Sequence, residues 1–313
     1  MQIINKNEKL AKILFIVLVF LCLTSFVSPP LALILGVLVA WFIGHPFLEY
    51  NGKAIHFLLK ASVVGLGFGM NATSAIKAGK EGIIFTIISI ISTMVFGFLL
   101  GKLLKVEKKT SYLISSGTAI CGGSAIAAIS PVIKAKEHQI SVALGVVFIL
   151  NAIALLVFPV IGHWLQLSQQ QFGLWCAIAI HDTSSVVGAS GSYGDEALQV
   201  ATTVKLARAL WIIPLAFLST FLFKNRDTKV KIPYFIGLFV LAMITNTYIP
   251  VIQLVSPYLV VTAKAGLTLT LFLIGCSLSL KVIKTVGVKP LIQGLLLWIF
   301  ISCIALWVVS CII

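Results

Sequence analysis

Apolar stretches long enough to cross a bilayer follow one another from end to end of the chain. A spanning helix needs about 20 mostly apolar residues, and lipid leaves unpaired backbone groups without hydrogen bonds. The whole chain, 1–313, is therefore predicted to be a single transmembrane domain, an all-α polytopic protein of about 9–11 transmembrane helices. The expected spans are 12–27, 31–45, 54–70, 82–100, 111–133, 140–163, 172–192, 197–223, 233–252, 258–280 and 289–312.

Composition supports a membrane protein and argues against several other classes. Of the 313 residues 59% are hydrophobic and 10% charged, whereas soluble domains carry roughly a quarter charged residues. The net charge of +14 comes from lysines and arginines in short connectors, as in cytoplasmic loops beside anionic lipid, so nucleic acid is not an expected partner. No Walker loop, HExxH or GxSxG pattern occurs, and we expect no enzymatic activity, cofactor or metal site.

The basic connectors also set an expected orientation. Placing the basic side in the cytoplasm puts the N-terminus inside and the C-terminus outside. No small-residue cleavage pattern follows residue 27, so the first span is expected to be retained. Two outer connectors would hold Lys77 and Lys80 beside Glu81, and the run 191–196, which has no basic residue. The inner connectors would be Lys6–Lys12, Lys53, Lys102–Lys109, Lys224–Lys231 and Lys281–Lys289.

Two polar runs interrupt the apolar spans. One is Gly117–Ile126, with the sequence GTAICGGSAI, and the other is His181–Ser185, with the sequence HDTSS. Irregular backbone at membrane depth is tolerated only inside protein or along a wet cavity. A pair of broken helices around a solute site is typical of secondary transporters. The two runs therefore predict a transporter.

The sequence is compatible with two paths for segment 111–133. A full crossing would put Lys134 and Lys136 outside, whereas a re-entrant hairpin would leave both inside. The two polar runs resemble each other at a shift of sixty residues, with Ser124 matching Ser184. A second echo links Lys60–Asn71 with Lys264–Ser277, in spans of opposite direction. Such echoes favour inverted repeats, and two re-entrant units separated by one span would be inverted.

The backbone of both breaks is a candidate for binding an anion. A half-helix starting after Gly122 and Gly123 would present the free N–H groups of Ser124 and its neighbours. Thr183, Ser184 and Ser185 could cap the second half-helix and still offer hydroxyls. The structural alternative is a Gly/Ser-rich surface for close helix packing.

Buried charge is the other candidate feature. Asp182 is the only carboxylate well inside an apolar span, beside His181, and an ionised Asp at the bilayer centre costs about 2.5–3.5 kcal/mol without a partner. Lys205 and Arg208 lie three residues apart, hence on one helical face. They could balance a solute's charge, form a salt bridge to Asp182, or snorkel to the interface. The basic excess favours an anionic solute over a cation.

Both polar runs, together with the stretch from Ala201 to Pro214, closely resemble the signature segments of the YeiH-type family, to which sulfate export is attributed. The resemblance covers nearly the whole chain. It implies a bacterial inner-membrane protein of about ten spans. It also implies distant similarity to the cation/proton antiporter and bile-acid symporter superfamily, with inverted repeats and crossing broken helices. That similarity favours a full crossing of 111–133.

The sequence thus predicts a multi-pass secondary transporter of a small anion, with sulfate, a sulfonate or a small carboxylate as candidates. A proton or sodium ion would be the coupling ion, the lipid bilayer the surroundings, and a homodimer a candidate assembly. The alternatives are a proton- or sodium-coupled cation antiporter using Asp182, and a channel or structural membrane subunit. The predicted substrate-binding residues are Thr118, Gly122, Gly123, Ser124, His181, Asp182, Thr183, Ser184, Ser185, Lys205 and Arg208.

Overall fold

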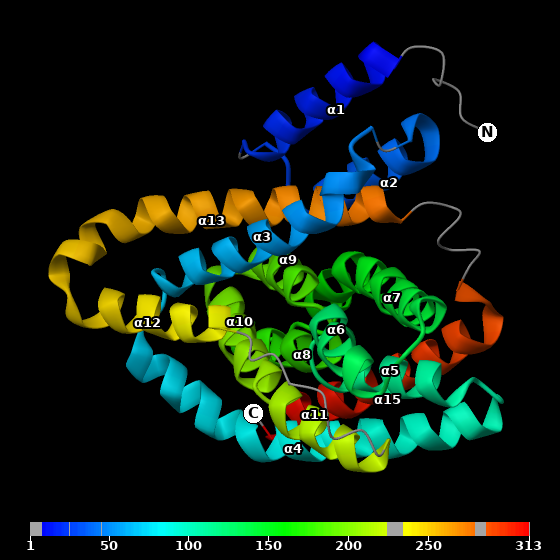
Figure 1. Ribbon diagram of the computed structural model, residues 1–313. Coiled ribbons are helices and arrows are strands. Elements are labelled where there is room, and N and C mark those ends of the chain that lie inside the picture. The colour runs from blue at the N-terminus through cyan, green and yellow to red at the C-terminus, as the bar shows by residue number, and fades with distance from the viewer. Residues whose placement is uncertain (1–7, 25, 45, 224–233, 279–285, 313) are drawn as a thin grey trace. The chain divides into compact units, whose positions relative to one another are not determined.

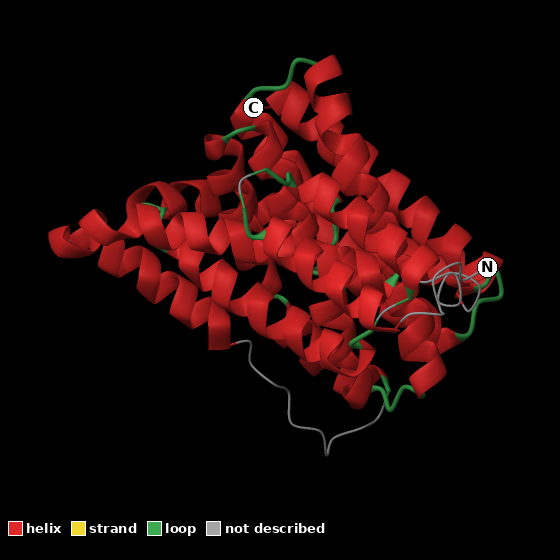
Figure 2. Cartoon of the chain, turned by 90° about the horizontal axis from the view of Figure 1, so that it is seen from above, coloured by secondary structure: helices red, strands yellow, loops and turns green. Residues whose placement is uncertain are grey.

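The described chain is helical. A computed structural model describes residues 8–24, 26–44, 46–223, 234–278 and 286–312, in which helices occur and strands do not (Figure 2). Lys6, the connector 224–233, residues 279–285 and the side chains of Lys77, Lys80 and Glu81 lie outside the described residues. Within the described ranges, five helices are long and apolar enough to cross a membrane: Phe85–Leu103, Glu137–Trp164, Asp195–Leu222, Pro250–Ser277 and Val288–Cys311. These helices confirm the predicted all-α membrane fold.

The chain divides into two compact units, each built from two separate stretches of sequence. Unit 1 comprises Met1–Ile76 and Pro233–Val282, and unit 2 comprises Lys77–Ile232 and Ile283–Ile313. The helices of unit 1 are α1 (Glu8–Cys22), α2 (Pro29–Leu38), the π-helical turn η1 (Val39–Ile43), α3 (Leu48–Gly67), α12 (Tyr234–Tyr248) and α13 (Pro250–Ser277) (Figure 1).

Helix α13 is the centre of unit 1, in contact with α2, α3 and α12. Asn51, near the start of α3, donates its amide to the carbonyl of Leu273 (3.1 Å) and the hydroxyl of Ser277 (2.9 Å), near the end of α13. The two helices therefore run in opposite directions, as the sequence echo predicts. Helices α2 and α13 approach closely where a Cβ on Gly36 would lie 3.0 Å from the Cα of Gly275.

The boundary between the last two helices of unit 1 differs from the prediction. We expected spans at 233–252 and 258–280, but the chain turns at Ile249, and α13 continues through Pro257. Gln253 stabilises this early turn, because its side-chain amide donates to the carbonyls of Asn246 (3.0 Å) and Thr247 (3.4 Å) at the end of α12. Polar residues that look like a connector in a hydropathy profile are here the first turns of the helix.

Unit 2 contains two broken helices and the spans that hold them. The broken pairs are α5 (Lys108–Ala119) with α6 (Gly123–Val132), and α8 (Gln169–Ala179) with α9 (Thr183–Tyr193). The remaining helices are α7 (Glu137–Trp164), α10 (Asp195–Ala209), α11 (Ile212–Leu222), α15 (Val288–Ile312) and, from Lys77 onward, α4 (Ala72–Leu103).

The α5–α6 pair is a re-entrant hairpin. Lys109, in the first turn of α5, donates its Nζ to the carbonyl of Lys134, just after α6 (2.7 Å). Glu107 accepts from the amide of Gln139, near the start of α7. Both ends of the hairpin therefore lie at the N-terminal end of α7.

The α8–α9 pair is a second re-entrant hairpin that enters from the other end of α7. The hydroxyl of Tyr193, at the end of α9, donates to the carbonyl of Leu167, just before α8 (2.6 Å). The Tyr193 ring stacks on His163 in the last turn of α7, with ring centroids 4.3 Å apart. The two hairpins are therefore inverted relative to each other. Segments 111–133 and 172–192 do not cross as spans, and the full crossing implied by the family resemblance is wrong.

Helix α15 supports both hairpins. Near its start, the Gln293 amide donates to the hydroxyl of Ser111 on α5 (2.7 Å) and the carbonyl of Gly97 on α4 (3.1 Å). Further along, the carbonyl of Ser302 accepts from the indole of Trp175 on α8 (3.0 Å). Helix α15 thus runs from the open end of the α5–α6 hairpin, where Ser111 lies, to the middle of α8.

Candidate solute-binding site

The two breaks meet beside the middle of α7. Gly122, between α5 and α6, has φ +59° and ψ −121°, a conformation essentially confined to glycine. A Cβ at this position would lie 3.0 Å from Cγ1 of Val147 and 3.2 Å from the carbonyl oxygen of His181. The glycine therefore serves both the turn and the close approach of the second break. Gly123 is different, because a Cβ there would meet nothing nearer than 3.5 Å.

Asn151 holds the second break in place. Its Oδ1 accepts the backbone N–H of His181 (2.9 Å) and of Asp182 (3.3 Å). These two donors have no place in a helical ladder, because α8 has ended and α9 has not begun. Asn151 is not among the predicted site residues, although a lone side-chain amide in the mostly apolar span 140–163 is a signal that could have indicated it.

Asp182 caps α9. Its Oδ2 accepts the backbone N–H of Ser184 (3.1 Å) and Ser185 (3.4 Å), and also the hydroxyl of Ser184. A carboxylate at this position satisfies orphan N–H groups and complements the helix dipole. The expectation that the hydroxyls of residues 183–185 cap this helix is therefore wrong, and its N-terminus is already occupied by the chain's own anion. Thr183, Ser184 and Ser185 are all buried.

The two buried cations bind helix C-termini. Lys205 donates its Nζ to the carbonyls of Ala177 (3.2 Å) and Ile180 (2.7 Å), at the end of α8. Arg208 reaches both hairpins, donating Nε to the carbonyl of Ala119 at the end of α5 (2.8 Å) and Nη1 to that of Ile178 (3.2 Å). Cations stabilise this negative end of a helix.

The structure contradicts two of the three roles predicted for the cations, snorkelling to the interface and a salt bridge to Asp182. Lys205 and Arg208 are fully buried, so neither snorkels to an interface. Across the described residues, neither forms a salt bridge with Asp182; the ion pair found there joins His138 and Glu107. The buried charges are thus matched to helix ends and not to each other.

The N-terminus of α6 differs from the other three half-helix ends. Its N-cap is Gly122, which offers no side chain to the N–H groups of the first turn. Gly123 is half-buried and Ser124 is exposed. The first turn of an α-helix carries unsatisfied N–H groups and a partial positive charge, which suits an anion.

Several buried polar atoms around the breaks have no hydrogen-bond partner among the described residues. They are Oγ1 of Thr118, Nδ2 of Asn151, both ring nitrogens of His181 and Nη2 of Arg208. Buried polar groups are normally paired, and exceptions mark places where water, an ion or a solute binds. Donors predominate in this set. The structure thus brings the predicted residues together from four helices, with Ser124 and Gly123 at the margin.

Sequence comparisons agree with a membrane protein. Residues 9–307 match the family described as Conserved hypothetical protein 698. The chain belongs to this family. It is 58% identical over 282 residues to a UPF0324 membrane protein of Bacteroides thetaiotaomicron, covering 89% of this chain and 85% of that relative. It is 50% identical over 304 residues to one of Bdellovibrio bacteriovorus, covering 95% and 93% respectively. No solved structure matches the chain.

Proposed function

We propose that this family member is a secondary transporter of a small anion. The observation that carries the proposal is the unequal filling of the four half-helix ends. Two C-termini bind Lys205 and Arg208, and one N-terminus binds Asp182, which leaves the N-terminus of α6 without a side-chain cap. Because each helix end carries about half a charge and the two kinds of end cancel, the excess of one buried cation favours one bound anion.

Each predicted residue has a role in this proposal. The amides of Gly123 and Ser124 and the Ser124 hydroxyl bind the anion, and Thr118 and His181 supply further polar atoms. Arg208 and Lys205 fix the ends of α5 and α8 and provide the balancing charge. Asp182, with Thr183, Ser184 and Ser185, closes α9, while Gly122 sets the turn. Sulfate, a sulfonate and a small carboxylate fit this chemistry, because each offers several oxygens to N–H donors.

The anion would reach its site from alternate sides of a bacterial inner membrane. The hairpin α5–α6 opens at the end of unit 2 that carries Lys102, Lys105, Lys109 and Lys136, whereas Asp195 and Glu196 follow the hairpin α8–α9. The positive-inside rule places the lysine-rich end in the cytoplasm, with the N-terminus on the same side.

A labelling experiment tests this orientation. Lys136→Cys and Glu196→Cys, both at exposed positions, are made separately in a chain whose six cysteines are replaced by serine. An impermeant thiol reagent added to intact cells should label position 196 and not 136. Labelling of both positions from outside would contradict the re-entrant path of α5–α6.

Transport itself is tested with purified protein in liposomes. Counterflow of labelled sulfate, a sulfonate or a small carboxylate should be saturable and should depend on protein. Flux of sodium or protons that needs no anion would instead support a cation antiporter using Asp182. Non-saturable flux without counterflow would support a channel, and an absence of any flux would support a structural subunit. Repeating the assay with imposed proton and sodium gradients identifies the coupling ion.

A further inference from the structure

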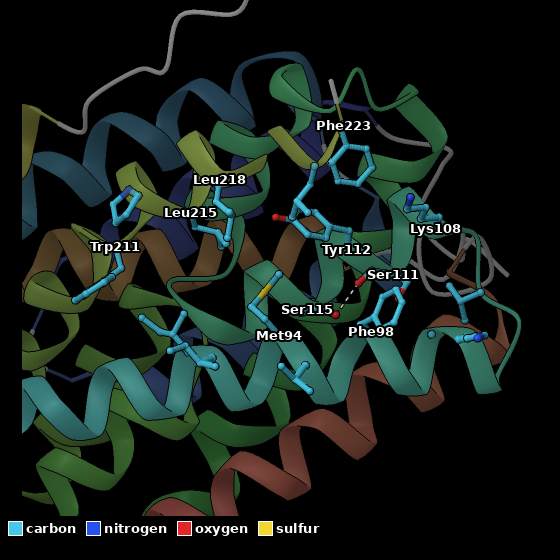
Figure 3. A pocket seen from close by; sticks show the side chains of 18 of the residues that line it. Met94, Phe98, Lys108, Ser111, Tyr112, Ser115, Trp211, Leu215, Leu218 and Phe223 are labelled. Carbon is cyan, nitrogen blue, oxygen red and sulfur yellow. Dashed lines mark hydrogen bonds between the residues drawn. The ribbon is translucent and has the colours of Figure 1, made fainter. Parts of the chain in front are cut away.

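An apolar groove lies on unit 2, away from the half-helix ends. It is a cavity of about 770 Å³ between α4, α5 and α11. Figure 3 shows Met94 and Phe98 of α4 on one side and Trp211, Leu215 and Leu218 on the other, with Tyr112 of α5 between them. From Ile87 to Lys102 the α4 wall is about 22 Å long, at 1.5 Å of rise per residue.

The hydroxyl groups of the groove wall already have partners. The hydroxyl of Tyr112 is hydrogen-bonded to that of Ser219 (2.7 Å). Ser115 donates to the carbonyl of Ser111 (2.8 Å), and Ser111 to that of Gly97 (3.4 Å). The wall therefore suits an apolar chain better than a polar solute.

Two lysines stand at one end of the groove. Lys102 ends the α4 wall and Lys108 begins α5, and both are exposed. The Nζ of Lys108 lies 5.4 Å from the centre of the Phe223 ring (Figure 3). This end faces the side where the hairpin α5–α6 opens, which is rich in lysine. A long apolar groove with cations at its membrane-surface end complements an amphiphile with an anionic head.

We propose that this groove binds one anionic phospholipid of the inner leaflet. An acyl chain lies between α4 and α11, and the phosphate contacts Lys102 and Lys108. The site is independent of the transport proposal, because it shares no residue with the half-helix ends. A lipid held there fills the space between α4 and α11. Helix α11 continues from α10, the helix that carries Lys205 and Arg208.

Native mass spectrometry tests the proposal directly. Purified protein is titrated with phosphatidylglycerol and with phosphatidylcholine of the same acyl chains. The wild-type chain should retain one phosphatidylglycerol in preference. Lys102→Gln with Lys108→Gln should lower that preference about 25-fold, since each lysine near an anionic lipid surface contributes about fivefold. Lys136→Gln, an exposed lysine at the same end that does not line the groove, should leave it unchanged.

A second variant tests the acyl-chain contact. Leu218 is 52% exposed and lines the groove, so Leu218→Trp should narrow it and reduce binding of both lipids without unfolding the protein. Equal retention of the two lipids by the wild type, or an unchanged preference in the double lysine variant, would overturn the proposal. So would a dimer that Leu218→Trp dissociates, because the groove would then hold a second copy of the chain.

Discussion

The two hairpin tips have the same architecture, and they differ in what caps the helix that follows the break. The tip of α8–α9 is closed: Asp182 caps the N-terminus of α9, Lys205 and Arg208 bind carbonyls at the C-terminus of α8, and Asn151 accepts the amides between the two helices. At the tip of α5–α6, Arg208 binds the C-terminus of α5, but α6 begins at a glycine without a side-chain cap. Inverted units can therefore share a path while only one keeps a free binding end.

Arg208 should produce the largest effect, because it donates hydrogen bonds to both tips. Arg208→Gln removes two charge-assisted hydrogen bonds, each contributing about 1.5–3 kcal/mol, and should lower the free energy of unfolding by about 3 kcal/mol or more. Anion flux should disappear. Thermal unfolding in detergent and counterflow in liposomes measure the two effects.

Lys205→Gln is the matched comparison, since Lys205 binds the α8–α9 tip alone. It should destabilise that tip and spare part of the flux. Adding Asp182→Asn to Arg208→Gln should not restore stability, because no salt bridge joins these residues in the described structure. A stable, active double variant would show that the two charges form a pair in the membrane.

Gly122 and Gly123, at the tip of α5–α6, should differ sharply in their tolerance of substitution. Gly122→Ala forces a positive φ on a residue with a Cβ and should cost about 1–3 kcal/mol, with loss of flux. Gly123→Ala has room for its Cβ and should change stability by no more than about 1 kcal/mol. Melting temperatures of the two variants give the contrast. Equal tolerance of both changes would mean that the tip does not depend on its backbone turn.

Two variants of Asp182 distinguish its role as the N-cap of α9 from a role in coupling transport to an ion gradient. Asp182→Ala removes the N-cap and should destabilise the protein by about 1 kcal/mol, whereas Asp182→Asn keeps capping ability. If the carboxylate serves only as a cap, Asp182→Asn should retain anion flux. Loss of gradient-driven flux with intact counterflow in this variant would instead assign coupling to Asp182.

The smallest effect is expected at Thr118. Its buried hydroxyl has no partner among the described residues, so Thr118→Val should leave the melting temperature unchanged or slightly raised. If the hydroxyl binds the anion, affinity should fall about two- to tenfold, as for one neutral hydrogen bond. Ser116→Ala is the control, because that hydroxyl already donates to the carbonyl of Leu113. Equal anion affinities in the two variants would remove Thr118 from the site.

The sequence predicted the breaks well, because backbone that leaves a helix in lipid needs unusual residues. Gly122 and Asp182 stand out in apolar surroundings and lie at the two turns. The path of 111–133 was not decided, since hydropathy is the same for a crossing segment and a hairpin. The contact of Lys109 with Lys134 supplied the missing information.

The partners of the buried cations were beyond sequence reasoning. Lys205 and Arg208 bind main-chain carbonyls, and a carbonyl is present at every position, so no residue type marks it. Asn151 was recognisable in principle as a polar residue in an apolar span. Its role depends on which amides lie opposite, and that is a property of the fold.

Helix α15 has a consequence for how the protein is made. Ribosomes deliver the N-terminal part first, so both hairpins enter the membrane before the helix that braces them exists. Until residues 288–312 emerge, Ser111 and Trp175 lack the partners Gln293 and Ser302. Helix α15, which is made after both hairpins, thus completes their packing, and a nascent chain that stops before it would leave both hairpins without this support.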